Sequence, residues 1–265
     1  MTTVLSKLDR AKFHADQFIE KWGRFAASSI YTVTTDQEAP WTVHLTWIYQ
    51  PDSPETQSAL TELCLIYADF LSNLRATLDY LAWQLVLMAG NAPTDQTGFP
   101  AAKNRANFGS LRAQKLRGIK GRWIDLIESL QPYNAQNLHD DMFFILDHNN
   151  NIAKHRSMHA VIVSMKTTRE RPLKFNMSHP EMAGRRFQFD NLLDGPVEAG
   201  EDLFKITADP PIRDLVVTPA VLPARIKFED GLTHAADFDY TNHDLIRWTA
   251  GTVAKFHSAF DPPTF

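Results

Sequence analysis

A continuous apolar stripe over residues 54–89 constrains the fold more than any other feature of the chain. Ser53 suits a helix N-cap, Pro54 suits the first helical position, and Gly90 with Asn91 provides a stop signal. Apolar residues recur at steps of three and four, which keeps one face of a helix against a partner helix. At a rise of about 1.5 Å per residue this helix would be roughly 50 Å long, so we expect a helical bundle built around it. The stripe consists of Leu60, Cys64, Tyr67, Leu71, Leu74, Leu78, Leu81, Leu85 and Met88.

The overall composition is that of a folded protein without a special environment. The 265 residues suit one large domain or two small ones, and 44% hydrophobic and 22% charged residues are ordinary values. The single cysteine, Cys64, excludes an intrachain disulfide, and its place in the apolar stripe predicts an inert thiol. No apolar run is long enough for a signal peptide or a membrane span, and no glycine-rich phosphate loop occurs. We therefore expect a cytoplasmic protein that has no membrane contact, no metal and no cofactor.

The remaining periodicities predict helices first, strands second and a closing helix. Apolar spacing predicts a helix over residues 6–25, and alternation over residues 31–49 predicts a β-hairpin with its turn at residues 36–40. A short helix is expected at Trp123–Leu130, and a second long helix from about His139 to Met165. The last helix starts near residue 240. Candidate strands are Leu173–Met177, Phe187–Phe189, Leu203–Thr207, Leu215–Thr218 and Arg225–Phe228.

This order of elements predicts an α+β fold with three parts. Residues 1–166 would form the helical bundle, with the hairpin inserted at residues 29–50. Residues 167–239 would form a small, mostly antiparallel sheet. Residues 240–265 would form the C-terminal helix, which packs back on the rest.

Polar residues interrupt the inner face of both long helices. On the second helix, steps of three and four give Phe144, His148, Asn151, His155, Met158 and Ile162. If the two helices pack together, this polar middle would meet Arg75, Asp79 and Tyr80 of the first helix. A buried guanidinium needs a carboxylate partner, and Asp147 or Asp79 could supply one.

Two interpretations of this polar layer are open. In the first, the layer only fixes the register of the two helices. In the second, it lines a cleft or a dimer seam in which His155, Arg75 and Tyr80 contact a ligand. The candidate catalytic residues are Arg75, Asp79, Tyr80, Asn151, Lys154 and His155.

Histidines of the second helix raise the alternative of a metal site. His155 and His159 are one helical turn apart, and His148 precedes them with Asp147 at its side. The pattern lacks a second acidic helix motif, and Lys154 beside His155 would repel a cation. We therefore predict no metal.

Charge is distributed unevenly along the chain. The stretch between Gln96 and Ile124 has no acidic residue and a formal charge of +7. The whole chain has a net charge of −4, so the rest of the chain carries −11. Such a segment can bind phosphate groups, with Phe108 and Trp123 available for stacking, or it can be an ordinary solvated surface. We call residues 103–122 the basic segment. Its candidate nucleic-acid-binding residues are Lys103, Arg105, Arg112, Lys115, Arg117, Lys120 and Arg122.

Four motifs together resemble a family of uncharacterised bacterial proteins. They are Asn-Leu-Arg-Ala-Thr-Leu-Asp-Tyr-Leu-Ala-Trp at residues 73–83, Phe99-Pro100, Leu-Gln-Pro-Tyr at residues 130–133, and Asn-Asn-Ile-Ala-Lys-His-Arg at residues 150–156. The resemblance covers roughly residues 5–165. It brings no assigned activity, because the family has none.

The helical part is also distantly similar to HEPN domains. These helical bundles often form dimers, and many are metal-independent ribonucleases, whereas others bind RNA or nucleotides without cleaving them. Their catalytic signature is an Arg followed four to six residues later by a His. Here four residues separate Arg75 from Tyr80, which takes the place of the His, and tyrosine, with a pKa of about 10, is a poor general base at neutral pH.

Three functional hypotheses follow from the residues and from this resemblance. The first is a non-enzymatic HEPN-like protein, a homodimer, that contacts RNA or a nucleotide through the basic segment. The second is a toxin-like, metal-independent endoribonuclease that uses Arg75 with His155 or Tyr80. The third is a purely structural polar layer in a dimerising bundle.

Overall fold

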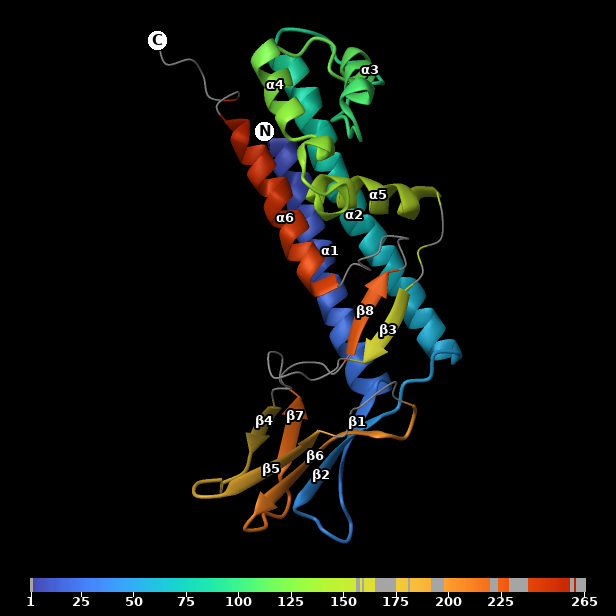
Figure 1. The fold of residues 1–265 in the computed structure, drawn as a ribbon, viewed down its shortest axis with the longest axis vertical. Helices are drawn as coiled ribbons and strands as arrows, with labels where there is room; N and C mark the ends of the chain where they lie inside the picture. The colour runs from blue at the N-terminus through green and yellow to red at the C-terminus, as the bar shows by residue number, and fades with distance from the viewer. Residues whose placement is uncertain are drawn as a thin grey trace. The chain divides into compact units, whose positions relative to one another are not determined.

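The computed structural model describes residues 2–155, 158, 160–164, 175–180, 182–191, 198–219, 224–228, 238–257 and 260. Over these residues six α-helices combine with short antiparallel strand pairings, which confirms the α+β class (Figure 1). None of the described helices is both long enough and apolar enough to cross a membrane.

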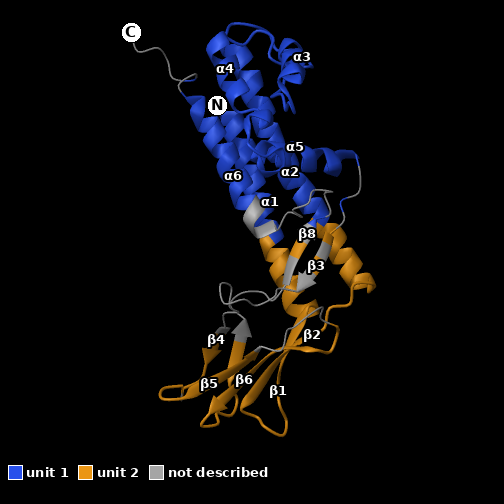
Figure 2. Cartoon of the chain, viewed as in Figure 1, with its two compact units in different colours: residues 1–18, 64–159, 228–265 blue, residues 19–63, 160–227 orange. Residues whose placement is uncertain are grey.

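The chain divides into two compact units (Figure 2). Unit 1 comprises residues 1–18, 64–159 and 228–265, and unit 2 comprises residues 19–63 and 160–227. This division differs from the expected one, because the hairpin belongs with the strand-rich region rather than with the helical bundle. The physical reason is strand pairing, because the second hairpin strand, β2 (Thr42–Trp47), also pairs with strand β6 (Asp202–Asp209).

Helix α2 (Pro54–Met88) confirms the predicted central helix, and most of it lies in unit 1. The Ser53 hydroxyl accepts a hydrogen bond from the Thr56 amide at 3.1 Å, so Ser53 is the N-cap. Gly90 ends the helix with a φ of +80°, a conformation that favours glycine. Its fully buried side chains in unit 1 include those of Tyr67, Phe70, Leu71, Leu74 and Leu78.

Aromatic side chains hold the helices of unit 1 together. The ring of Phe143 lies 5.2 Å from that of Trp248 on helix α6 (Phe238–Lys255) and 5.5 Å from that of Phe99. Helix α1 (Thr2–Ser29) adds Phe18, whose ring lies 6.3 Å from that of Tyr67 on α2. Because rings of this size bury large apolar areas, these contacts fix the positions of the polar groups beside them.

Two short helices follow the loop after α2. Helix α3 (Arg105–Lys115) contains much of the basic segment and is not predicted by the sequence. It begins at Asn104, whose side-chain oxygen accepts a hydrogen bond from the Asn107 amide at 2.8 Å. Helix α4 (Gly121–Ser129) is the predicted short helix. Two 3₁₀ turns, Pro132–Asn134 and Leu138–Asp140, lead on to the next helix.

Helix α5 (Met142–His155) is shorter than expected. Instead of continuing to Met165, the chain forms strand β3 (Ala160–Ser164), and the run Val-Ile-Val at residues 161–163 explains this because β-branched side chains favour strands.

The buried face of α5 also differs from the predicted one. The expected stripe through Asn151 and His155 is exposed, whereas the buried residues are Phe143, Phe144, Leu146, Asn149 and Asn150. Phe144 is common to both sets.

Unit 2 is built on a four-stranded antiparallel sheet in the order β1-β2-β6-β5. The predicted hairpin is confirmed, with Tyr31 opposite Trp47. The strands are β1 (Tyr31–Thr35), β2 (Thr42–Trp47), β5 (Arg186–Asn191) and β6 (Asp202–Asp209). Two further pairs are β4 (Phe175–Ser178) with β7 (Val216–Pro219), and β3 with β8 (Ala224–Phe228). One small apolar space is lined by Val33, Val43, Leu45, Phe204, Ile206 and Val217, so β7 contributes to the core of the sheet.

Candidate functional site

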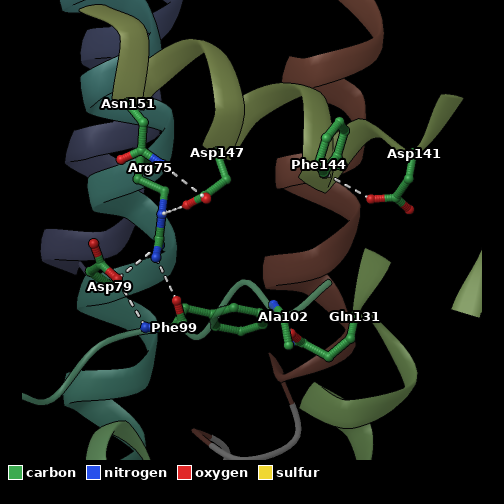
Figure 3. Close-up of polar contacts among 9 residues, drawn as sticks. All are labelled: Arg75, Asp79, Phe99, Ala102, Gln131, Asp141, Phe144, Asp147 and Asn151. Atoms are coloured by element: carbon green, nitrogen blue, oxygen red, sulfur yellow. Dashed lines mark hydrogen bonds and ion pairs between the residues drawn. The ribbon is translucent and has the colours of Figure 1, made fainter. Parts of the chain in front are cut away.

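Arg75 is the centre of a polar network in unit 1 (Figure 3). Although only 7% of this residue is exposed, its guanidinium makes three hydrogen bonds. Nε donates to Asp147 Oδ1 at 3.2 Å, Nη1 donates to Asp79 Oδ1 at 2.8 Å, and Nη2 donates to the Phe99 carbonyl at 2.5 Å. Arg75 therefore connects α2, α5 and the segment after α2, and it satisfies the requirement that a buried charge be paired.

The carboxylates of Asp79 and Asp147 each accept a further hydrogen bond. Asp79 Oδ1 also accepts a hydrogen bond from the Phe99 amide at 2.9 Å, and Asp147 Oδ2 accepts one from Asn151 Nδ2 at 3.1 Å. Gly98 allows this arrangement, because a Cβ atom at this position would lie 2.9 Å from Asp79 Oδ1. The sequence left Asp79 and Asp147 as alternative partners of Arg75, and the structure uses both.

A cavity of about 310 Å³ lies beside this network. We call it the Arg75 cavity. Helices α2, α3 and α5 each contribute to its wall, and the segment between α2 and α3 adds Ala101. Its polar lining consists of Arg75, Asp79, Lys115, Asp147, Asn150, Asn151 and Lys154.

The described lining of the Arg75 cavity carries a net positive charge. Arg75 is paired with two carboxylates, whereas neither Lys115 nor Lys154 forms an ion pair with any described residue. Three cations and two carboxylates give the lining a formal charge of +1. Two free ammonium groups on one concave wall favour an anionic occupant.

Asn150 is the least expected member of the lining. It is only 2% exposed, and its Oδ1 atom has no hydrogen-bond partner among the described residues. Because a buried acceptor without a donor is costly, this atom needs a water molecule or a ligand hydroxyl. The sequence analysis missed Asn150 because it assigned Asn151, the next residue, to the inner face.

A second concave region lies at the next turn of α2. It has a volume of about 240 Å³ and is lined by Asp79, Tyr80, Trp83 and Thr97. We call it the aromatic pocket. Tyr80 and Trp83 are each 39% exposed, and the Lys7 ammonium lies 5.8 Å from the centre of the Tyr80 ring. Asp79 lines both this pocket and the Arg75 cavity.

The structure thus brings together four of the six predicted catalytic residues. Arg75, Asp79, Asn151 and Lys154 line the Arg75 cavity, and Tyr80 lines only the aromatic pocket. His155 is exposed at the end of α5 and lines neither space.

The described residues offer no other obvious chemistry. His159, considered above for a metal site, lies outside the described residues. Among those that are described, no three His, Cys, Asp or Glu side chains are grouped to hold a metal ion. Burial raises the pKa of the Cys64 thiol to about 11, so this thiol is protonated at neutral pH.

The predicted nucleic-acid-binding residues fall into two groups. Lys115 is partly buried in the wall of the Arg75 cavity. The other six are exposed, namely Lys103, Arg105, Arg112, Arg117, Lys120 and Arg122. Phe108 and Trp123 are 2% and 8% exposed, so neither ring is available to stack with bases. They form core contacts instead, since the ring of Trp123 lies 5.7 Å from that of Phe256.

A second polar cluster lies on the sheet of unit 2. His44 Nδ1 lies 2.5 Å from Asp202 Oδ2, Thr46 donates to Asp202 Oδ1 at 2.6 Å, and His44 Nε2 lies 3.8 Å from Asp36 Oδ2. The amides of Ala39 and Glu38 lower the pKa of Asp36, and His44 adds to this effect. Because these groups satisfy one another, we interpret the cluster as a structural link between β2, β6 and the hairpin turn.

No protein-family description, curated protein or solved structure matches this chain. The resemblance to the bacterial family and to HEPN domains therefore stays a prediction.

Proposed function

We propose that this protein binds the phosphate groups of RNA or of a nucleotide and does not cleave its ligand. The observation that carries the proposal is a pair of lysines on the wall of the Arg75 cavity, Lys115 and Lys154, neither of which forms an ion pair with a described residue. Two ammonium groups on one wall attract a phosphate, and release of the ligand's counterions adds to the binding free energy.

The position of Lys115 connects the cavity to the basic segment. Lys115 is the last residue of α3, and Arg112 lies on the same helix one turn before it. Arg112, Arg117 and Lys120 are exposed and form no ion pair with a described residue. A strand that entered the cavity with one phosphate could therefore place neighbouring phosphates near further cations.

The geometry of Arg75 favours binding over catalysis. Its three hydrogen bonds direct the guanidinium to the protein's own acceptors. Among the described residues no histidine lines the Arg75 cavity, so none of them is placed there to take a proton from a ribose hydroxyl. We therefore assign Arg75 a positioning role, in which it holds Asp79, Asp147 and the Phe99 segment.

Retention of the purified protein on an immobilised single-stranded RNA tests this function. We expect retention at low salt that weakens as salt rises. The double variant Lys115→Glu with Arg117→Glu should bind much more weakly, because two cations become anions. If the two side chains contact two phosphates, the slope of log K against log salt should also fall by about 1.4.

The matched control is Lys12→Glu with Arg24→Glu, which makes the same change in net charge at exposed positions on α1. This control should be retained like the wild type. Absence of retention at low salt, or equal loss in both double variants, would contradict the proposal. Incubation with RNA and EDTA should leave the RNA intact. Cleavage by the wild type that is lost in an Arg75→Ala variant shown to be folded by circular dichroism would support the ribonuclease hypothesis instead.

A further inference from the structure

Asp79 lines both the Arg75 cavity and the aromatic pocket. The two spaces differ in chemistry: one carries Lys115 and Lys154, and the other carries Tyr80 and Trp83. Together their volumes of about 310 and 240 Å³ fall within the roughly 300–1,000 Å³ of small-molecule sites. A ligand that filled both would have an anionic end and a flat, apolar end.

The aromatic pocket suits a flat ring. Tyr80 and Trp83 lie one turn apart on α2, and both expose more than a third of their surface. Exposed aromatic side chains beside a cationic groove are a common arrangement for stacking nucleobases. Thr97 offers little for hydrogen bonding to a ligand, because its hydroxyl already accepts a hydrogen bond from the Thr94 amide at 2.9 Å.

Asp79, which lines both spaces, suits a ligand group that donates hydrogen bonds. Both hydrogen bonds of the Asp79 carboxylate use Oδ1, and Oδ2 has no partner among the described residues. In the cavity, the buried Oδ1 of Asn150 also lacks a donor. Inorganic phosphate would neutralise the lysines but would supply few donors at neutral pH. Ribose hydroxyls supply donors, and carboxylates are common acceptors for them.

We infer that the two spaces form one site for a ribonucleotide, an inference that depends on the phosphate-binding function proposed above. The base lies against Trp83 and Tyr80. The ribose hydroxyls donate to Asp79, and the phosphate binds Lys115 and Lys154. The site therefore distinguishes a ribonucleotide from its deoxy form and from its parts.

Isothermal titration calorimetry of the full chain with AMP, dAMP, adenosine and inorganic phosphate tests this inference. AMP should bind most tightly, and loss of the 2′-hydroxyl in dAMP should weaken binding about tenfold. Trp83→Ala should weaken AMP binding by about tenfold or more, because the stacking surface is lost. The matched control is Leu87→Ala, an exposed apolar residue one turn later on α2 that lines neither space.

A second pair of variants probes the phosphate end. Lys115→Met should weaken AMP binding, whereas Lys120→Met should not, since Lys120 does not line the cavity. Circular dichroism checks that each variant is folded. Both pairs of substitutions are at exposed or partly exposed positions, so loss of folding is not expected to hide the result.

The outcomes separate this inference from the proposed function. Equal binding of AMP and dAMP, phosphate binding as tight as AMP binding, or an unchanged Trp83→Ala variant would overturn the ribonucleotide site. Retention on RNA without any binding of AMP would overturn this inference alone. Absence of both RNA retention and AMP binding would overturn both.

Discussion

Replacing Arg75 with alanine is expected to lower the free energy of unfolding by about 2–3 kcal/mol. The substitution removes three hydrogen bonds and leaves Asp79, Asp147 and the Phe99 carbonyl without their shared donor. Breaking a fully buried pair costs about 3–5 kcal/mol, and we reduce this value because the Asp79 and Asp147 side chains are 41% and 27% exposed. Urea-induced unfolding, followed by circular dichroism, measures the change.

Two further variants make this result specific. Arg75→Lys keeps the charge but cannot direct three hydrogen bonds to three acceptors, so it should recover only part of the lost stability. Arg112→Ala removes an exposed arginine of the same unit and should change stability by less than about 0.5 kcal/mol. If Arg75→Ala were as mild as Arg112→Ala, the polar network would not hold the helices together.

Phe143→Ala is expected to have the largest effect on stability, a loss of about 3–5 kcal/mol. Phe143 is fully buried, and its ring contacts those of Trp248 and Phe99. The ring also lies 5.8 Å from the Arg75 guanidinium, so a cavity at this position removes support from the polar network as well.

Phe13→Ala is the matched control, because Phe13 is 45% exposed on α1. It should cost well under about 1 kcal/mol. The same urea titration compares the two variants. Equal losses in both would mean that Phe143 does not occupy the core of unit 1.

Elements with strong local signals could be predicted from the sequence. The apolar stripe and the terminal residues defined α2 almost to the residue, and strict alternation defined the β1–β2 hairpin. Helix α3 was missed because its sequence is polar and only Phe108 is buried. The predicted length of α5 is too great because the helical spacing of side chains continues in the sequence beyond His155. The β-branched run at residues 161–163 forms a strand instead.

The candidate site could be predicted only in part, because much of it depends on contacts between distant segments. The need of Arg75 for a carboxylate follows from burial of a charge, and this requirement led to Asp79 and Asp147. The roles of Gly98 and of the Phe99 backbone could not be found in this way, since loop backbones carry no periodic signal. Assigning Asn151 rather than Asn150 to the inner face was an error of one residue, which rotates a helical face by about 100°.

Lysine labelling of the wild-type protein tests the central claim, that the Arg75 cavity binds phosphate groups, most directly. An amine-reactive reagent is applied with and without single-stranded RNA, and the modified lysines are identified by mass spectrometry. We predict that RNA protects Lys115 and Lys154, whereas Lys12 and Lys21 on α1 react equally in both samples. If Lys115 and Lys154 react to the same extent whether or not RNA is bound, the Arg75 cavity is not the phosphate site.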